Sequence, residues 1–173
     1  MEYAHDYLRG DAMNVCLMVH SKTGTTLKFG KQIAAALEKE GHAVEFTELT
    51  TDQPVSINVQ GKPNTFKITN LPSEKDFDVF IVGSPVWGGQ PTPVALEAIA
   101  QAKGLKGKKF MPFVTQGLPF PSWGGKQSLA KLAKKAEEKN AAVLEGVSIG
   151  RLFKSLDTEI EKGVQKILAV LKR

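Results

Sequence analysis

Short apolar runs alternate along the chain with segments in which apolar residues recur every three or four positions. The apolar runs predict buried strands at Asn14–His20, Ala43–Leu49, Asp78–Gly83, Lys109–Thr115 and Val143–Ile149. The periodic segments predict helices at Thr26–Glu40, Thr92–Lys103, Lys126–Asn140 and between Leu156 and Leu171. Alternation of helices with uniformly apolar strands favours a parallel sheet covered on both faces. The sequence therefore predicts a doubly wound α/β domain with five strands in the order 2-1-3-4-5.

The stretch between the second and third predicted strands departs from this alternation. Residues 55–69 read VSINVQ-GKPN-TFKIT, which is typical of a β-hairpin rather than of a crossover helix. We therefore expect a hairpin insertion in place of the second helix, with any helix before the third strand missing or reduced to a turn around Pro72–Phe77.

The length of 173 residues fits one domain, which we place at residues 13–173. Residues 1–12 contain acids and no apolar run of the kind found in signal peptides, so we expect a dispensable extension there. No stretch approaches the roughly 18 apolar residues of a membrane helix. The single cysteine, Cys16, permits no internal disulfide, which suits a reducing cytoplasm.

The net charge of +5 is unevenly distributed. Residues 101–139 contain nine lysines and two glutamates, a local net charge of +7. A basic face of this kind can dock an acidic protein partner, although a solvated helix face explains it more simply. Nucleic acid is not an expected partner, because this stretch has no arginines and few interleaved aromatic residues.

The loop after the first strand carries the clearest chemical signal. It reads Ser21-Lys22-Thr23-Gly24-Thr25-Thr26, with four hydroxyls around one glycine at the start of a predicted helix. Backbone N–H groups at a helix N-terminus lack partners and, with the helix dipole, favour an anion. Hydroxyls can donate to the same anion. One hydroxyl would suffice for an ordinary helix cap, so this loop predicts a phosphate-binding site.

Other phosphate-binding patterns do not fit the chain. Neither G-x-x-x-x-G-K-[ST] nor G-x-G-x-x-G occurs. The small tyrosine phosphatases require a cysteine that opens the loop, whereas Cys16 lies inside the first strand. Response-regulator receivers require an aspartate at the end of the third strand, where this chain has Gly83-Ser84.

The loops after the third and fourth strands combine aromatic residues with glycine and proline. They read Ser84-Pro85-Val86-Trp87-Gly88-Gly89-Gln90-Pro91 and Gln116-Gly117-Leu118-Pro119-Phe120-Pro121-Ser122-Trp123-Gly124-Gly125. In open α/β sheets, ligands bind beyond the carboxyl ends of the strands where the strand order reverses, here between the first and third strands. The two loops therefore predict the walls of a slot for a planar ligand, with Trp87 as a lid and Phe120 or Trp123 on the other side.

On these three loops the chain resembles the flavodoxin family, over roughly residues 13–172. The S-x-T-G-x-T pattern at Ser21–Thr26 is similar to the family's FMN phosphate loop, GSPVWGG at Gly83–Gly89 to the loop over one flavin face, and TQG…WGG at Thr115–Gly125 to the loop at the other face. The resemblance implies non-covalently bound FMN, held by Ser21, Lys22, Thr23, Gly24, Thr25, Thr26, Ser84, Pro85, Val86, Trp87, Gly88, Gly89, Thr115, Gln116, Gly117, Phe120, Trp123, Gly124 and Gly125. Two departures are the hairpin at 55–69 and the absence of acids, which the family often has near the flavin, from both flavin loops.

The resemblance implies a one-electron carrier that shuttles electrons between redox partner proteins, with FMN supplying the chemistry. The alternative on the same fold is an NAD(P)H-dependent quinone or flavin reductase, which needs an open flavin face. A third reading is a phosphate-binding regulatory module without flavin, which would be colourless. No catalytic residue or metal site can be placed, and we interpret the histidines as structural.

Overall fold

The computed structural model describes residues 11–117, 122–151 and 154–173. The elements, in chain order, are β1 (Asn14–Val19), α1 (Thr25–Lys39), β2 (Ala43–Glu48), β3 (Val79–Trp87), β4 (Gln90–Pro91), α2 (Pro93–Gln101), β5 (Lys109–Gln116), α3 (Gly125–Glu137), β6 (Ala142–Val143), β7 (Val147–Gly150) and α4 (Leu156–Leu171). No helix among the described residues is long and apolar enough to cross a membrane.

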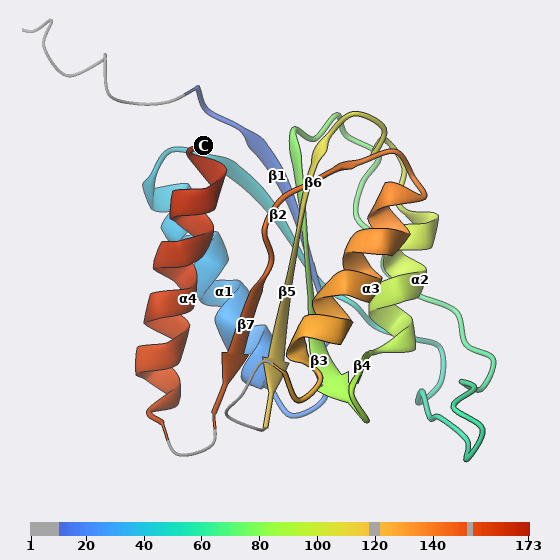
Figure 1. Ribbon diagram of the computed structural model, residues 1–173. Coiled ribbons are helices and arrows are strands. Elements are labelled where there is room, and N and C mark those ends of the chain that lie inside the picture. Colours follow the sequence, from blue (N-terminus) through green and yellow to red (C-terminus); the bar gives the residue numbers. More distant parts are fainter. Residues whose placement is uncertain (1–10, 118–121, 152–153) are drawn as a thin grey trace, which may run out of the picture.

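The sheet has the order β2-β1-β3-β5-β6, with β7 also paired to β5 (Figure 1). The pairs β1·β2, β1·β3, β3·β5, β5·β6 and β5·β7 are all parallel. The short β4 is antiparallel to β3. Since β6 and β7 together form the fifth parallel strand, the predicted order 2-1-3-4-5 is confirmed.

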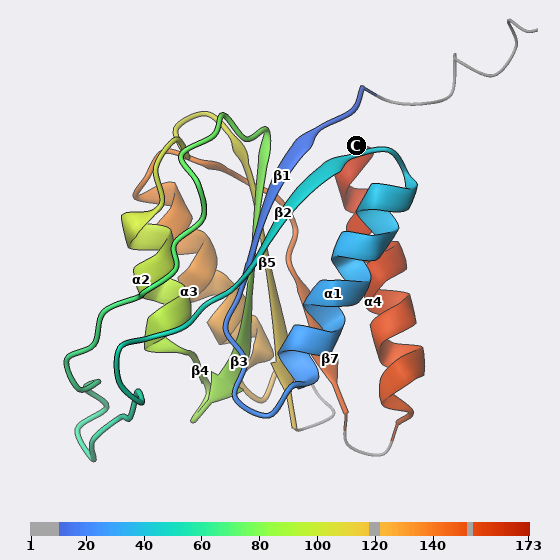
Figure 2. The same cartoon turned by 180° about the vertical axis from the view of Figure 1, so that it is seen from behind.

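Helices cover the two faces of the sheet in pairs, α1 with α4 and α2 with α3 (Figures 1 and 2). Alternate residues of each strand supply the two cores. In β1, Val15, Leu17 and Val19 pack toward α1 and α4, whereas Cys16 and Met18 pack toward α2 and α3. Both faces of β1 are therefore buried, which explains why this strand is apolar throughout instead of alternating.

The fifth strand is divided because of a proline in its neighbour. The N–H of Leu144 donates to the carbonyl of Phe110, so the backbone groups of Phe110 point toward the fifth strand. The backbone groups of every second β5 residue after Phe110 point the same way. Pro112 is the next β5 residue on that side and has no N–H to donate. Pairing stops at Phe110–Val143 and resumes at Phe113–Val147. Between these two pairs, residues 144–146 of the fifth strand lie opposite only residues 111 and 112 of β5. The predicted continuous strand 143–149 is thus two short strands around a bulge.

The connection from β2 to β3 contains no helix, as expected, and its hairpin is irregular. Antiparallel contacts within it are isolated bridges at Thr51–Ile68 and Ile57–Pro63. The Asn58 side chain forms the tip by accepting from the N–H groups of Gln60 and Lys62, at 3.0 and 2.8 Å. Side chains such as Phe66 pack against the core on the α2 and α3 face, so this segment covers the sheet where a second helix would otherwise lie.

The third strand runs four residues beyond its predicted end at Gly83. Its pairing with β5 continues to Pro85–Thr115, and Val86 and Trp87 then pair with β4. Most of the predicted loop is therefore strand, because Ser84 and Pro85 pair with β5 and the residues after them form a short hairpin with β4. The remaining loop is the two-residue turn Gly88-Gly89.

We expect Gly83→Ala to destabilise the fold. A Cβ on Gly83 would lie 2.1 Å from the Phe113 ring, and that ring already packs edge-on against Phe29 at 4.9 Å in the buried core. Overpacking of this kind costs about 1–3 kcal/mol. Urea unfolding should show the loss, whereas Gly117→Ala, with nothing within 4 Å of its Cβ, should change stability little. Equal stability of both variants would contradict this packing.

Candidate functional site

The segments that follow β1, β3 and β5 lie at one edge of the sheet, where the strand arrows end (Figure 1). Hydrogen bonds join them there. The N–H of His20 donates to the carbonyl of Gly83 at 3.0 Å. The hydroxyls of Thr26 and Thr115 lie 2.7 Å apart and are both buried. The structure thus brings the three predicted loops together at the expected place.

The first loop ends in a helix N-terminus that has no side-chain cap. Gly24 occupies the N-cap position of α1, and no acidic residue lies in the first turn. The Ser21 hydroxyl accepts from the N–H of Gly24 at 3.1 Å, which folds the loop, while Thr23 and Gly24 are exposed. The first N–H groups of α1 therefore have no capping side chain, and the first turn of the helix contains no acidic residue, an arrangement that favours a bound anion.

Thr25 and Thr26 differ in their availability to a ligand. Thr26 is buried and bonded to Thr115, whereas Thr25 is only partly buried. A hydroxyl can accept one hydrogen bond and donate another, so Thr26 keeps a hydrogen for a ligand if Thr115 is the donor. Replacing Thr26 would also leave Thr115 without this partner, so Thr26 contributes to the fold of the site.

Sequence reasoning missed Arg151, which follows β7 and reaches the first loop. Its Nη1 donates to the Thr25 hydroxyl at 3.3 Å, and its backbone N–H donates to the carbonyl of Gln116 at 3.2 Å. Guanidinium groups make strong charge-assisted hydrogen bonds to phosphate. The sequence did contain a signal for Arg151, because this residue directly follows the fifth parallel strand. The end of that strand lies at the same edge of the sheet as the ends of the first, third and fourth.

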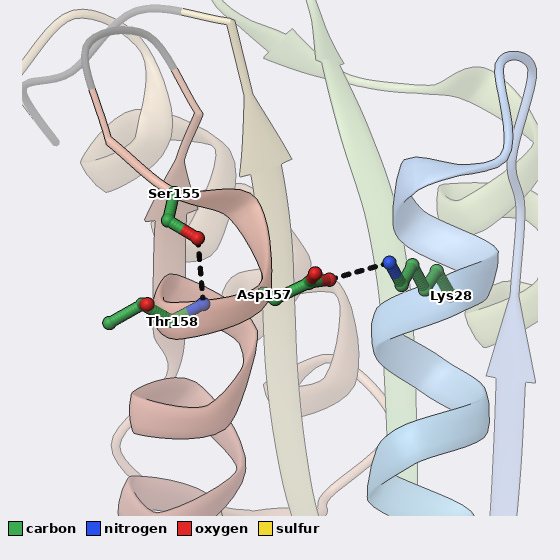
Figure 3. A network of polar contacts seen from close by, with 4 residues as sticks. All are labelled: Lys28, Ser155, Asp157 and Thr158. Atoms are coloured by element: carbon green, nitrogen blue, oxygen red, sulfur yellow. Dashed lines mark hydrogen bonds and ion pairs between the residues drawn. The ribbon is translucent and has the colours of Figure 1, made fainter.

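Lys28, one turn into α1, is less available to an anion. Its Nζ lies 2.6 Å from Asp157 Oδ1, next to the start of α4, where the Ser155 hydroxyl accepts from the N–H of Thr158 at 3.5 Å (Figure 3). Both members of the ion pair are well exposed, so the pair contributes little to stability. Its consequence is that the Lys28 charge is already balanced by a carboxylate.

The second loop is a tight turn held against the first loop. Gly88 and Gly89 have φ angles of 54° and 79°, the left-handed pair that a two-residue hairpin turn requires. The half-buried Trp87 meets the His20 ring edge-on with centroids 5.5 Å apart, and Lys22 Nζ lies 5.4 Å from the centroid of its indole. Trp87 is therefore fixed in position by two residues at the start of the first loop.

The second and third loops touch through glycines. A Cβ on Gly124 would lie 2.9 Å from the Cα of Gly89, closer than side-chain carbons approach backbone. The Ser128 hydroxyl, in the first turn of α3, donates to the Gly89 carbonyl at 3.5 Å. The two loops thus meet through glycine backbone, at a contact that a side chain at Gly124 would disrupt.

The other predicted residues of these loops occupy different environments. Trp123 is 52% exposed, and Gly117 is exposed. Gln116 and Gly125 are buried, and Pro85 and Val86 are partly buried. Phe120 lies outside the described residues, so its predicted stacking role stays a prediction.

Ser84, predicted as a ligand, uses its hydroxyl inside the protein. It accepts from the N–H of Thr92 at 2.9 Å, and Thr92 caps α2 by accepting from the N–H of Ala95. The Nδ1 of His20 lies 2.8 Å from the Thr92 hydroxyl. This buried network joins the end of β1, the end of β3 and the start of α2, so it positions the site without facing it.

Comparison with known proteins places the fold. No protein-family model and no curated protein matches the sequence. Solved structures do match. They include oxidised flavodoxin 1 from Bacillus cereus (21% identity, 92% of this chain and 98% of that chain, TM-score 0.64) and a flavoprotein in complex with FMN from Lactobacillus acidophilus (18%, 88% and 99%, TM-score 0.61). A mutant of flavodoxin from Pseudomonas aeruginosa also matches (14%, 93% and 100%, TM-score 0.62).

These likenesses extend over nearly the whole of each matched chain. They define the class of the molecule: an α/β protein with the flavodoxin fold. The chain covers 98% or more of each of these three structures. The fold expected from the resemblance is therefore confirmed.

Burial of His20 makes stability depend on pH. Burial lowers its pKa to about 4, below the ordinary value of 6.5, so the folded protein resists protonation of this ring. The unfolded chain binds that proton between pH 6.5 and about 4, and stability should therefore fall as the pH falls through this window. The loss is at most about 3 kcal/mol, reduced by partial exposure of the ring.

Urea unfolding between pH 7 and pH 4.5 measures this dependence. His20→Asn, which keeps a polar atom for Thr92 but does not titrate, should flatten the slope in this range. A slope unchanged by the substitution would show that other groups cause the pH dependence.

Proposed function

We propose that this protein binds FMN non-covalently and carries electrons between partner proteins. The observation that supports this most strongly is the uncapped N-terminus of α1, with the exposed Thr23 and the partly buried Thr25, beside two glycine-rich loops that meet at Gly89 and Gly124. A phosphate and a flat ring system would each find a matching surface at the same edge of the sheet.

The residues present fit the two ends of FMN. Backbone N–H groups of α1, the hydroxyls of Thr23 and Thr25, and the Arg151 guanidinium would hold the phosphate. Trp87, fixed by His20 and Lys22, would cover one face of the ring, and Trp123 would stand on the other loop. FMN supplies the redox chemistry when bound, while this chain binds and orients it and limits access of water.

The expected partners are redox proteins with acidic faces, in the cytoplasm. Support comes from α3, which follows the third loop and carries Lys126, Lys131, Lys134 and Lys135. Opposite charges at such a face increase the rate of encounter and make it dependent on salt. An NAD(P)H-dependent reductase remains the second candidate on this fold, and kinetics distinguish the two.

The experiment that tests this function begins with reconstitution. Purified apoprotein mixed with FMN should give a protein-bound flavin spectrum, and a protein that stays colourless would contradict the proposal. The reconstituted protein is then mixed anaerobically with NADH or NADPH and, separately, reduced by light. A carrier should be reduced by light and only slowly by either nucleotide. Rapid reduction by a nucleotide would favour the reductase.

Thr23→Ala and Arg151→Gln should each weaken FMN binding by about tenfold or more, since a hydrogen bond to a charged group is worth about 1.5–3 kcal/mol. Both side chains are exposed, so the fold should be little affected. Riboflavin, which lacks the phosphate, is the matched control and should bind both variants as it binds the natural protein. Equal losses for FMN and riboflavin would show that this loop does not hold the phosphate.

A further inference from the structure

A groove of about 990 Å³ lies between the irregular hairpin, the Trp87–Gln90 turn and the helices α2 and α3. Figure 1 shows the hairpin beside α2, at the end of the sheet where the loops meet. Of the described residues that line the groove, none comes from 23–26 or from 115–125. Three of its lining residues, Lys22, Trp87 and Gly88, are also among the residues expected around FMN, so the groove adjoins the proposed flavin site while its other lining residues lie outside it.

The walls of the groove are largely apolar and partly aromatic. Phe66 of the hairpin and Leu96 of α2 line it together with Trp87 and several prolines. At its rim the hairpin leaves Val59 96% exposed and Ile57 38% exposed. Apolar side chains gathered around a concavity are typical of a binding site, because a ligand removes them from water.

The charges in the groove are predominantly positive. Lys131 and Lys135, one turn apart on α3, and Lys22, beside Trp87, line it together with a single acid, Glu97. Lys135 also lies 3.4 Å from Glu138, in a pair exposed enough to contribute little. Three ammonium groups against one lining carboxylate make the groove complementary to a negatively charged ligand.

We propose that this groove binds a small planar aromatic anion, such as an aromatic sulfonate or carboxylate. The volume lies within the range of about 300–1,000 Å³ that is common for small-molecule sites. The ring would pack between Phe66, Trp87 and Leu96, and the anionic group would lie toward the lysines. Among the described residues, Lys22 is the one member of the phosphate loop that lines the groove, whereas Phe66, Leu96 and the two α3 lysines lie outside the flavin site, so the proposal does not depend on FMN binding.

The probe for this site is naphthalene-2-sulfonate, with uncharged naphthalene-2-sulfonamide as its matched control. Titration of ¹⁵N-labelled protein should shift the amide resonances of Phe66 and Leu96 and should shift those of Thr23–Thr26 little. The sulfonate should bind more tightly than the sulfonamide, and added salt should reduce that difference. Absence of binding, or shifts centred on the phosphate loop, would overturn the proposal.

Charge variants on one helix separate a local site from general attraction. Lys131→Gln with Lys135→Gln should weaken sulfonate binding about fivefold, from two exposed charge interactions. Lys126→Gln with Lys134→Gln removes the same net charge from α3 at positions that do not line the groove, and should change binding less than about twofold. Equal losses in the two double variants would overturn the proposal.

The same titration with saturating FMN distinguishes this site from the proposed flavin site. Naphthalene-2-sulfonate should bind whether or not FMN is present. Competition with FMN, together with amide shifts centred on Thr23–Thr26 instead of on Phe66 and Leu96, would place the sulfonate in the flavin slot and overturn the groove proposal. If FMN itself fails to bind, the measurements on FMN-free protein still decide the groove proposal, so the two proposals fail separately.

Discussion

The parallel pairing of β1 with β3 and of β3 with β5 is the constraint on which the site depends. It directs the ends of three strands, which are far apart in the sequence, to one edge of the sheet. Hydrogen bonds then join Thr26 to Thr115 and His20 to Thr92, across 89 and 72 residues. These contacts are possible only in one register, because a shift of one residue would turn every strand side chain toward the opposite core.

Small residues let the elements at this edge approach one another. Gly83 leaves room for the Phe113 ring of the neighbouring strand β5, and Gly124 lets the third loop touch the backbone of Gly89. Larger side chains at these positions would separate the same loops that the sheet brings together. The geometry of the site therefore depends on absent side chains as much as on the hydroxyls and cations that would contact a ligand.

Much of the fold could be predicted from the sequence, because burial on two faces leaves a clear pattern. The strand order, the four main helices and the hairpin in place of a helix all followed from apolar runs and periodicity. The end of β3 did not, because pairing with β5 extends that strand to Pro85 and pairing with β4 extends it to Trp87, although these residues have no alternating pattern. The division of the fifth strand depends on Pro112 in another strand, which local reasoning about residues 143–149 does not include.

The sequence predicts which loops form the candidate site, but not which side chains in them are used inside the protein. Hydroxyl and glycine content identified the loop at α1, whereas burial of the Ser84 hydroxyl in a network with Thr92 depends on packing between elements. Arg151 was missed because a lone arginine after a strand has no distinctive neighbours. The predicted strand order already places the end of the fifth strand beside that of the fourth, but the contact of the Arg151 side chain with Thr25 depends on packing that the strand order does not specify.

The bulge opposite Pro112 also affects how this molecule behaves among copies of itself. The fifth strand is the outermost strand on one side of the sheet, and its outward N–H and C=O groups could pair with a strand from another chain. This outermost strand is divided into β6 and β7, of two and four residues, with the bulge between them. An incoming strand would lose its hydrogen-bond register at the bulge, so the proline that divides the fifth strand also protects this outermost strand against aggregation.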